Sequence, residues 1–314
     1  MPRTLFAFVV RVSGTSQIAI SLLSIAVFLL NTAPLELQRR MMNAVVHDRD
    51  VTLVLGLAAA YVGVVFSEGL VKLLMNVCRG WVGEKATRAL RLAANAVAGA
   101  RAGRRHEPYI QGVQISMILA EPEPIGAFTG DAISEPLLQT GILISVFGYM
   151  LYTQPLLAAV SILMFSPQFL FVPVMQRAIN RRVQSRIVVL RETSVGVLPG
   201  KVDEVQTALR QEMRFAEIFE LNMGIFKLKY SMNFLMNLTQ NVAKVVVLGV
   251  GGWLVISGQT EVGTLVAFLS GLHNLNDPWG DLVDWFRDLM VNSAKYAIFV
   301  DAMARFAGHQ RAQP

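Results

Sequence analysis

The chain has 314 residues, of which 54% are hydrophobic and only 16% are charged. Soluble domains have about 25% charged residues, so this composition excludes an ordinary soluble enzyme and indicates an integral membrane protein. The single cysteine, Cys78, excludes an internal disulfide and a cysteine-based metal site. A net charge of +6 would favour nucleic-acid binding in a soluble protein, but in a membrane protein basic residues first report topology. We therefore expect the lipid bilayer, and no nucleic acid, as a partner.

A membrane-spanning helix needs about 20 mostly apolar residues. The third of the candidate segments is short, and the sixth is interrupted by polar residues. The first is too long for the apolar part of a signal peptide and has no small-residue cleavage pattern, so we expect a retained helix. The sequence therefore predicts an all-α membrane protein, a single domain over 1–314, with six transmembrane helices at about 17–37, 51–77, 137–152, 155–174, 234–256 and 262–291.

The basic residues predict the orientation of these helices. Seven Lys or Arg lie in the long loop 78–136 and ten in the long loop 175–233, whereas the short loops 153–154 and 257–261 have none. Cytoplasmic loops carry an excess of Lys and Arg. We therefore expect both long loops and both termini in the cytoplasm, and a bacterial inner (cell) membrane as the location. Only the first short loop runs against this trend, with Arg39, Arg40 and Arg49.

The long loops keep the pattern of helices. Residues 79–103 have apolar side chains at helical spacing, and no proline occurs from Val51 to Arg105. A continuous helix of about 50 residues would be about 75 Å long, whereas the hydrocarbon core is about 30 Å thick. The second loop repeats the pattern, with helical sequence from Met175 to Leu198, a break at Pro199–Gly200 and helical sequence again from Val202. We expect two long helical hairpins that project into the cytoplasm.

Three groups of residues carry a family resemblance over nearly the whole chain. The first is Leu90–Arg91 followed by Gly112, Ser116 and Glu121, the second is Gln211–Glu212, Phe219 and Asn222 after the Pro199–Gly200 break, and the third is Gly251–Phe268 with Pro278 ten residues on. In order and spacing they resemble the transmembrane domain of ABC exporters. The glycine-flanked hairpin in Gly251–Phe268 is the most specific of the three. The chain departs from the family at Met117, where an Arg is usual, and at Glu121, where an Asp is usual.

This resemblance implies the fold of ABC exporters, with long cytoplasmic extensions and coupling helices at their tips. It also implies a second transmembrane subunit, identical or different, and coupling tips that dock on nucleotide-binding domains. By position the tips would be residues 104–115 and 199–208. The residues expected to couple to an ATPase are His106, Glu107, Tyr109, Ile110, Lys201, Asp203 and Glu204.

The sequence contains no ATP-binding motif of its own. A phosphate-binding loop needs G-x-x-x-x-G-K-[ST] after a strand; the segment from Gly196 to Val202 imitates it, but its spacer is one residue short and its last position is apolar. Nucleophile elbows, metal-spaced histidines and dinucleotide-binding loops are also missing. We therefore expect a transport subunit and not an enzyme, with no cofactor in this chain, and with ATP and magnesium bound by a separate ATPase chain.

Four aspartates recur in the sixth apolar segment at intervals of four, three and four, which places them on one face of a helix. A charge at the centre of a bilayer costs about 2.5–3.5 kcal/mol on insertion scales, so this face must border water or be neutralised, for example by Arg287, Lys244, Lys72 or protons. We expect it to form a cation-attracting wall of the substrate pathway, unless the lower pair is simply hydrated in the cytoplasm. The candidate pathway residues are Asp277, Asp281, Asp284, Asp288, His273 and Asn274.

Three functions remain open from the sequence. The first is the membrane-spanning subunit of an ATP-driven exporter that works by alternating access. The second is a proton-driven secondary peptide carrier that has the exporter fold but no ATPase. The third is a noncatalytic membrane scaffold, or a chain cut short before its ATPase. The helical sequence that extends into the cytoplasm favours the first.

Overall fold

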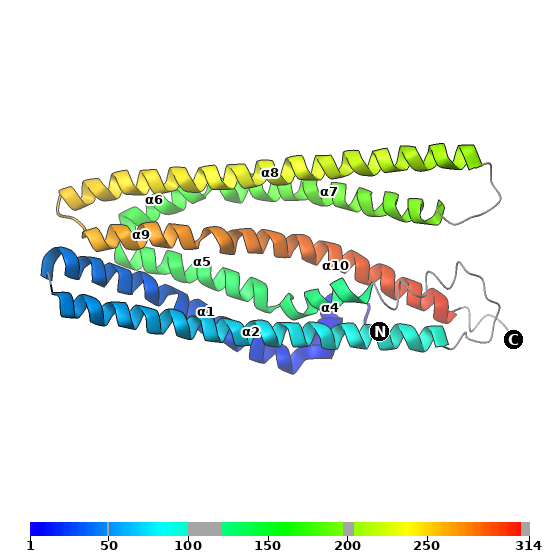
Figure 1. The fold of residues 1–314 in the computed structure, drawn as a ribbon, viewed down its shortest axis with the longest axis horizontal. Helices are drawn as coiled ribbons and strands as arrows, with labels where there is room; N and C mark the ends of the chain where they lie inside the picture. Colours follow the sequence, from blue (N-terminus) through cyan, green and yellow to red (C-terminus); the bar gives the residue numbers. More distant parts are fainter. Residues whose placement is uncertain (49, 100–120, 197–203, 309–314) are drawn as a thin grey trace. The chain divides into compact units, whose positions relative to one another are not determined.

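The computed structural model describes residues 1–48, 50–99, 121–196 and 204–308 (Figure 1). All the regular elements in these ranges are helical. In chain order they are α1 (Leu5–Asn43), the short π-helical turn η1 (Ala44–Asp48), α2 (Val51–Gly99), α4 (Pro122–Asp131), α5 (Ser134–Thr153), α6 (Pro155–Phe165), α7 (Pro167–Gly196), α8 (Glu204–Ile256), α9 (Val262–Asn274) and α10 (Asn276–Gly308).

Five helical stretches in the described ranges are long and apolar enough to cross a membrane, which is consistent with an integral membrane protein. They are Leu5–His47, Val51–Val97, Pro122–Thr153, Pro155–Leu190 and Gln211–Ile256. The expected sixth segment, 262–291, is divided between α9 and α10, and the helix is interrupted at Leu275. The 13 residues of α9 are too few to cross a bilayer, and four aspartates follow within the first 13 residues of α10.

The long helices extend well beyond the apolar segments. The helix α2 continues without a break for 49 residues, and α8 for 53. The prediction of one continuous helix of about 50 residues from Val51 is therefore confirmed. The break expected at Pro199–Gly200 lies outside the described residues.

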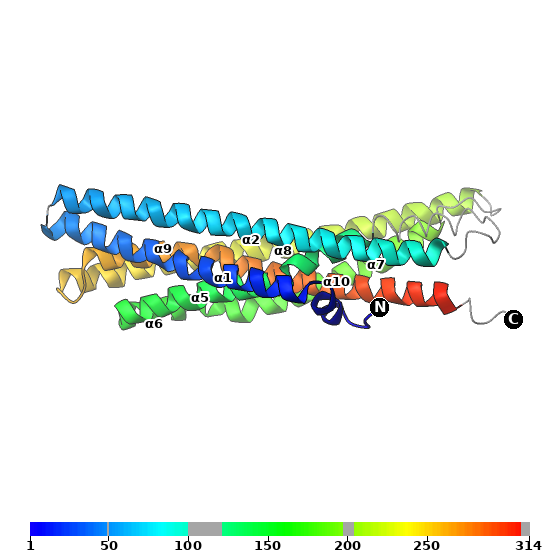
Figure 2. The ribbon, with the colours of Figure 1, turned by 90° about the horizontal axis from the view of Figure 1, so that it is seen from below.

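The chain divides into two compact units, unit 1 (residues 1–163 and 242–314) and unit 2 (residues 164–241). In unit 1, α1 and α2 run side by side in both views (Figures 1 and 2). Polar side chains link them: Asn31 donates to Glu68 over 3.1 Å, and Gln38 donates to the Tyr61 hydroxyl over 3.3 Å.

One end of unit 1 carries the turn after α1, the α5–α6 junction and the α8–α9 turn, and we call it the hairpin end (Figure 1). Arg39 of α1 pairs with Glu36 on its own helix and, over 3.3 Å, with Glu261 at the start of α9. Asn43 donates to Glu261 and accepts from the Gly263 backbone N–H over 2.9 Å. These contacts join α1 to α9.

A buried cluster from α1, α2, α4 and α10 forms the core at the opposite end of unit 1. In it, Phe8 packs on Tyr296 with ring centroids 5.3 Å apart. The Tyr296 hydroxyl donates to the Pro2 carbonyl over 2.9 Å, which ties the start of the chain to α10. Burial raises the pKa of Tyr296 to about 12. The cluster consists of Leu5, Phe8, Val9, Ala86, Leu90, Ala94, Ile125, Phe128, Ala132, Tyr296 and Phe299.

Small residues bring α4 close to α2. A Cβ added to Gly126 would lie 1.9 Å from the Thr87 hydroxyl oxygen and 2.9 Å from the Gly83 carbonyl oxygen. A Cβ added to Gly130 would lie 2.4 Å from the Arg79 carbonyl oxygen. Both contacts are closer than real Cβ atoms allow, so glycine is required at both positions for the two backbones to meet.

Local backbone geometry sets where α1 meets α4. Ser13 departs from helical angles, with φ −136° and ψ 16°, and its hydroxyl donates to the Val9 carbonyl over 2.8 Å. One turn on, the Gln17 amide donates to the Thr129 carbonyl of α4 over 2.7 Å. The bend and this bond fix the first part of α1 on α4.

Unit 2 is a pair of helices. The helix α7 runs beside the first part of α8 in the opposite direction (Figure 1). Arg182 donates to the Gly224 carbonyl over 3.0 Å, and Arg186 donates to the Asn222 side chain over 3.1 Å. Two arginines of α7 therefore hold polar groups of α8.

Candidate functional site

Unit 1 contains an open cavity of about 550 Å³ where α10 passes the α4–α5 junction and the middle of α2. It lies at the predicted aspartate face, and we call it the acidic cavity. Its lining residues are Arg79, Pro124, Ala127, Phe128, Asp131, Glu135, Asp281, Asp284, Trp285, Asp288, Val291, Asn292 and Lys295.

The α4–α5 junction provides the first pair of carboxylates. Asp131 and Glu135 are four residues apart across the turn between the two helices, so both reach the same side. The close approach at Gly130 places the α2 backbone beside them. Arg79 of α2 contacts Glu135, and its Nη1 lies 3.7 Å from the Asp131 Oδ1.

Arg79 is the most deeply buried charge in the acidic cavity. Its side chain is only 11% exposed, and its Nε and Nη2 make no hydrogen bond in the described structure. A buried guanidinium needs negative charge nearby, because burial without compensation costs several kcal/mol. Asp131 and Glu135 supply that charge.

The helix α10 provides the other carboxylates. Arg287 donates to Asp284 over 2.6 Å, and its Nε lies 3.4 Å from the Asp288 Oδ1. Of the alternatives given for this face, the structure shows Arg287 in contact with Asp284 and Asp288. Asp281 makes no ion pair within the described residues; it accepts a hydrogen bond of 2.9 Å from Gln139 of α5.

Gln139 connects the two sides of the acidic cavity. The same amide nitrogen donates to Glu135 over 2.6 Å and to Asp281 over 2.9 Å. The carboxylates of α5 and α10 are thus bridged by a neutral donor. One hydrogen bond to a neutral amide compensates less of the charge on Asp281 than an ion pair would.

An aromatic wall lies beside the carboxylates. The rings of Phe128 and Trp285 stack with centroids 6.4 Å apart, and both residues line the cavity. Pro124, Ala127 and Val291 extend this wall with apolar surface. The cavity therefore presents acceptors on one part of its surface and flat apolar groups on another.

Three of the six predicted pathway residues, Asp281, Asp284 and Asp288, line this cavity. Asp277 lies in the first turn of α10, is exposed and does not line it. His273 and Asn274 end α9, on the other side of the interruption at Leu275, and do not line it either. The role of all six in a substrate pathway stays a prediction.

Sequence reasoning missed the other half of the acidic cavity. In the sequence Arg79 is one of the seven basic residues that indicate topology, and Asp131, Glu135 and Gln139 are not among the predicted pathway residues. The spacing of four residues that these three keep is a sequence signal for one helical face. Nothing in the local sequence pairs that face with α10, because the two segments are about 150 residues apart.

The residues expected to couple to an ATPase lie almost entirely outside the described residues. This holds for His106, Glu107, Tyr109, Ile110, Lys201 and Asp203. Glu204 begins α8. Their proposed role therefore stays a prediction.

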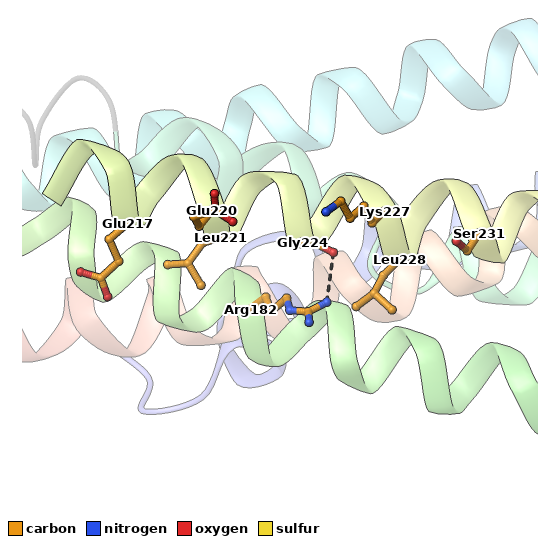
Figure 3. Close-up of a pocket in the computed structure, with 8 residues that line it drawn as sticks. All are labelled: Arg182, Glu217, Glu220, Leu221, Gly224, Lys227, Leu228 and Ser231. Carbon is orange, nitrogen blue, oxygen red and sulfur yellow. Dashed lines mark hydrogen bonds between the residues drawn. The ribbon is translucent and has the colours of Figure 1, made fainter. Parts of the chain in front are cut away.

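Unit 2 contains a second open cavity, of about 580 Å³, along α8 (Figure 3). Among the described residues, α7 contributes Arg182 to its lining, and the Arg182 side chain points to the Gly224 carbonyl. A Cβ at position 224 would lie 3.1 Å from the Arg182 Nε. The charged lining residues balance, with Arg182 and Lys227 against Glu217 and Glu220. We interpret this cavity as part of the packing between α7 and α8.

Within the part of the chain that the structure describes, no group of three or more His, Cys, Asp or Glu is arranged to hold a metal ion. Neither a scan of protein-family models nor a search of curated proteins gives a match to this chain. A functional assignment therefore has to be argued from the helices and from the acidic cavity.

Proposed function

We propose that the chain is the membrane-spanning subunit of an ATP-driven exporter of the ABC type, which moves its substrate by alternating access. A separate chain would hydrolyse the ATP, and a second transmembrane subunit would complete the pathway. The observation that carries this proposal is the length of α2 and α8. With 49 and 53 residues they are about 74 and 80 Å long, more than twice the roughly 30 Å thickness of the hydrocarbon core.

Helices that extend so far beyond the bilayer can transmit a movement from a partner protein outside the membrane to the membrane-spanning segments. A carrier that uses only an ion gradient can work with helices of membrane length. The surplus of about 44 Å on α2 and about 50 Å on α8 favours contact with a protein outside the membrane. The charge pattern of the loops favours the cytoplasm as the side where that contact is made.

The acidic cavity then falls near the inner boundary of the membrane. Arg79 is 28 residues beyond Val51, about 42 Å along α2. Glu135 is 18 residues before the end of α5, about 27 Å from the hairpin end. With the hairpin end at the outer surface, the cavity would open where cytoplasmic substrate enters, and its carboxylates would not have to face lipid.

Reconstitution into liposomes tests this proposal. The chain would be inserted with and without a purified candidate ATPase partner, and substrate movement would be followed under ATP and under a pH gradient. We expect transport only with both the partner and ATP. An ATPase partner in which the phosphate-binding lysine is replaced serves as the control, and no transport is expected with it. Transport by this chain alone, driven by protons, would overturn the proposal.

One observation favours the alternative, a proton-driven peptide carrier without an ATPase. Asp281 has no ion pair among the described residues, and Gln139 links it to Glu135 by two hydrogen bonds. Carboxylates in such an arrangement can exchange protons with water. The pH-gradient arm of the same experiment decides between the two functions.

The expected coupling residues give a second test. Glu107→Lys and Asp203→Lys reverse charges that we expect at the contact with the ATPase. They should reduce ATP-driven transport at least about tenfold while the chain still inserts and folds, because like charges across an interface cost several kcal/mol. Normal transport by both variants would remove these residues from the proposed contact.

A further inference from the structure

Unit 2 contains a zone in which α7 and α8 carry basic residues and no acidic residue. Residues 175–187 of α7 and 221–231 of α8 include neither Asp nor Glu. In α8 the last acidic residue before this zone is Glu220. The zone therefore has a net charge of +6, which comes from Arg177, Arg181, Arg182, Arg186, Lys227 and Lys229.

Two of these six residues are used in the packing of the helix pair. Arg182 and Arg186 donate to neutral groups of α8, so their charge is not compensated by a carboxylate. The other four are exposed and make no ion pair within the described residues. We call these four the basic belt: Arg177, Arg181, Lys227 and Lys229.

The pairing of the helices brings the basic belt to one level. The helices run in opposite directions, and Arg182 of α7 meets Gly224 of α8 (Figure 1). A step back along α7 from Arg182 therefore corresponds to a step forward along α8 from Gly224. The two belt arginines come one and five residues before Arg182, and the two belt lysines come three and five residues after Gly224. All four thus lie within a few residues of the same height on the pair.

The height of the basic belt is that of lipid headgroups. Lys229 is 27 residues before Ile256, about 41 Å along α8, and a bilayer with its headgroups is about 40–45 Å thick. Between these two residues the outer side chains of α8 are apolar, for example Phe234, which is 64% exposed, and Val245, which is 70% exposed. The basic belt therefore lies where the lipid-facing part of α8 ends.

An exposed aromatic pair accompanies the basic belt. The rings of Phe226 and Tyr230 stack with centroids 6.2 Å apart, and the two side chains are 47% and 64% exposed. Tyrosine is enriched at the boundary between acyl chains and headgroups, and Lys and Arg at this boundary attract anionic lipids. Unpaired positive charge beside exposed apolar and aromatic surface favours an anionic phospholipid over a soluble anion, because a soluble anion gains nothing from the apolar side chains.

We propose that the basic belt binds the headgroups of anionic phospholipids, whose acyl chains then lie along the exposed apolar side chains of α8. Unit 2 would hold a layer of such lipids at this face of the membrane. The inference goes beyond the proposed function and does not depend on it. It requires that α8 crosses a bilayer, but it requires neither an ATPase nor transport.

The test compares two lipids that differ in headgroup charge beside the basic belt. In a full-length chain with Cys78→Ser, Asn233→Cys carries a fluorophore one turn from Lys229, on the apolar side. The nanodiscs consist of phosphatidylcholine with a small, equal fraction of phosphatidylglycerol or phosphatidylcholine that has a nitroxide quencher on the same acyl carbon. We expect phosphatidylglycerol to quench at least about threefold more strongly. About 1 M salt, which shortens the Debye length to about 3 Å, should remove most of this difference.

A label at the other end of α8 is the control for position. Gln259→Cys, also with Cys78→Ser, places the fluorophore in the turn after α8. The nearby arginines of α1 are paired there with Glu36 and Glu261. We therefore expect the two lipids to quench this label equally.

Two combined variants test the charge of the basic belt itself. Replacing all four residues by glutamine should reduce the preference for phosphatidylglycerol to less than about 1.5-fold, because no belt charge remains. Exchanging Arg for Lys and Lys for Arg at the same four positions keeps the charge and should keep the preference. Gel filtration and the thermal midpoint check that both variants are folded. The headgroup and salt comparisons use the intact belt, so they decide the question even if the glutamine variant does not fold.

Equal quenching by the two lipids at position 233 would overturn the inference and would be expected if water alone or another protein covers the basic belt. A preference that is as strong at position 259, or that persists in a folded glutamine variant, would also overturn it, because the preference would then have another origin. None of these results bears on coupling to an ATPase. Conversely, absence of ATP-driven transport with an intact lipid preference would reject the proposed function and leave the lipid contact standing.

Discussion

The guanidinium of Arg79 is buried, and only its Nη1 contacts carboxylates in the described structure. Two unpaired buried nitrogens are unfavourable, so the position is held by its charge and not by a full set of hydrogen bonds. Asp131 and Glu135 provide the opposing charge at the end of α4 and the start of α5. The same residue thus stabilises the helix junction and limits the negative charge of the acidic cavity.

Arg79→Met should destabilise the protein by about 3 kcal/mol, because it leaves two carboxylates without their cation. Arg40→Met is the control: the Arg40 side chain is 62% exposed and, within the part of the chain that the structure describes, pairs with Glu36 alone, so we expect a loss below about 1 kcal/mol. Thermal unfolding in detergent measures both. Similar midpoints for the two variants would show that Arg79 is not a structural charge.

Tyr296→Phe should lower the free energy of unfolding by about 1 kcal/mol, the usual contribution of one hydrogen bond. The phenol donates to the Pro2 carbonyl from a buried position. Tyr152→Phe changes a side chain that is 89% exposed and should have no measurable effect. An unchanged midpoint for Tyr296→Phe would mean that the start of the chain is not tied to α10.

At the scale of the elements, the sequence predicted the long helices well and their interruptions poorly. Hydropathy and the absence of proline were sufficient to predict α2 as one helix, because both are properties of a single continuous segment. The interruption at Ser166 comes directly before Pro167, and the one at Leu275 lies among polar residues three positions before Pro278. Hydropathy averaged over a whole segment conceals both of these local signals. The start of α1 at Leu5, ahead of the predicted 17–37 span, was missed because hydropathy finds the part of a helix that suits lipid and not its ends.

The acidic cavity could be predicted only in part for a related reason. The spacing of Asp281, Asp284 and Asp288 places them on one face of α10, and the sequence shows this directly. That Arg79, Glu135 and Gln139 meet this face depends on close packing of α2 with α4 at Gly126 and Gly130. Contacts between segments so distant in sequence leave no pattern in either segment alone.

Gly126→Ala should destabilise the packing of α4 on α2 by about 2 kcal/mol or more, because the new methyl group has no room beside Thr87 and Gly83. Gly80→Ala is its control on α2: nothing lies within 4 Å of the added Cβ, and alanine is the better helix former by roughly 1 kcal/mol. We expect a lower midpoint for the first variant and an equal or higher one for the second. The opposite order would contradict the packing described.

At the scale of the whole molecule, the position of α2 across a membrane can be tested by thiol labelling. Replacing Cys78 by Ser removes the only cysteine. His47→Cys then marks the hairpin end, and Arg88→Cys marks a position about 55 Å along α2 from Val51. In sealed vesicles an impermeant thiol reagent should reach the first from one side and the second from the other. Labelling of both from the same side would show that α2 does not cross the bilayer.

The hairpin end of unit 1 is cross-linked by polar contacts. Glu36 of α1 accepts from Arg39, Arg40 and, over 2.9 Å, from Tyr149 of α5. Arg39 and Asn43 hold Glu261 ahead of α9. A force that separates α1 from α9 at this end has to break both contacts of Glu261, and one that separates α1 from α5 has to break the bond between Tyr149 and Glu36. We therefore expect α1, α5 and α9 to move as one rigid body at this end. Bending of the helices should occur where fewer contacts hold them, such as the interruption at Leu275.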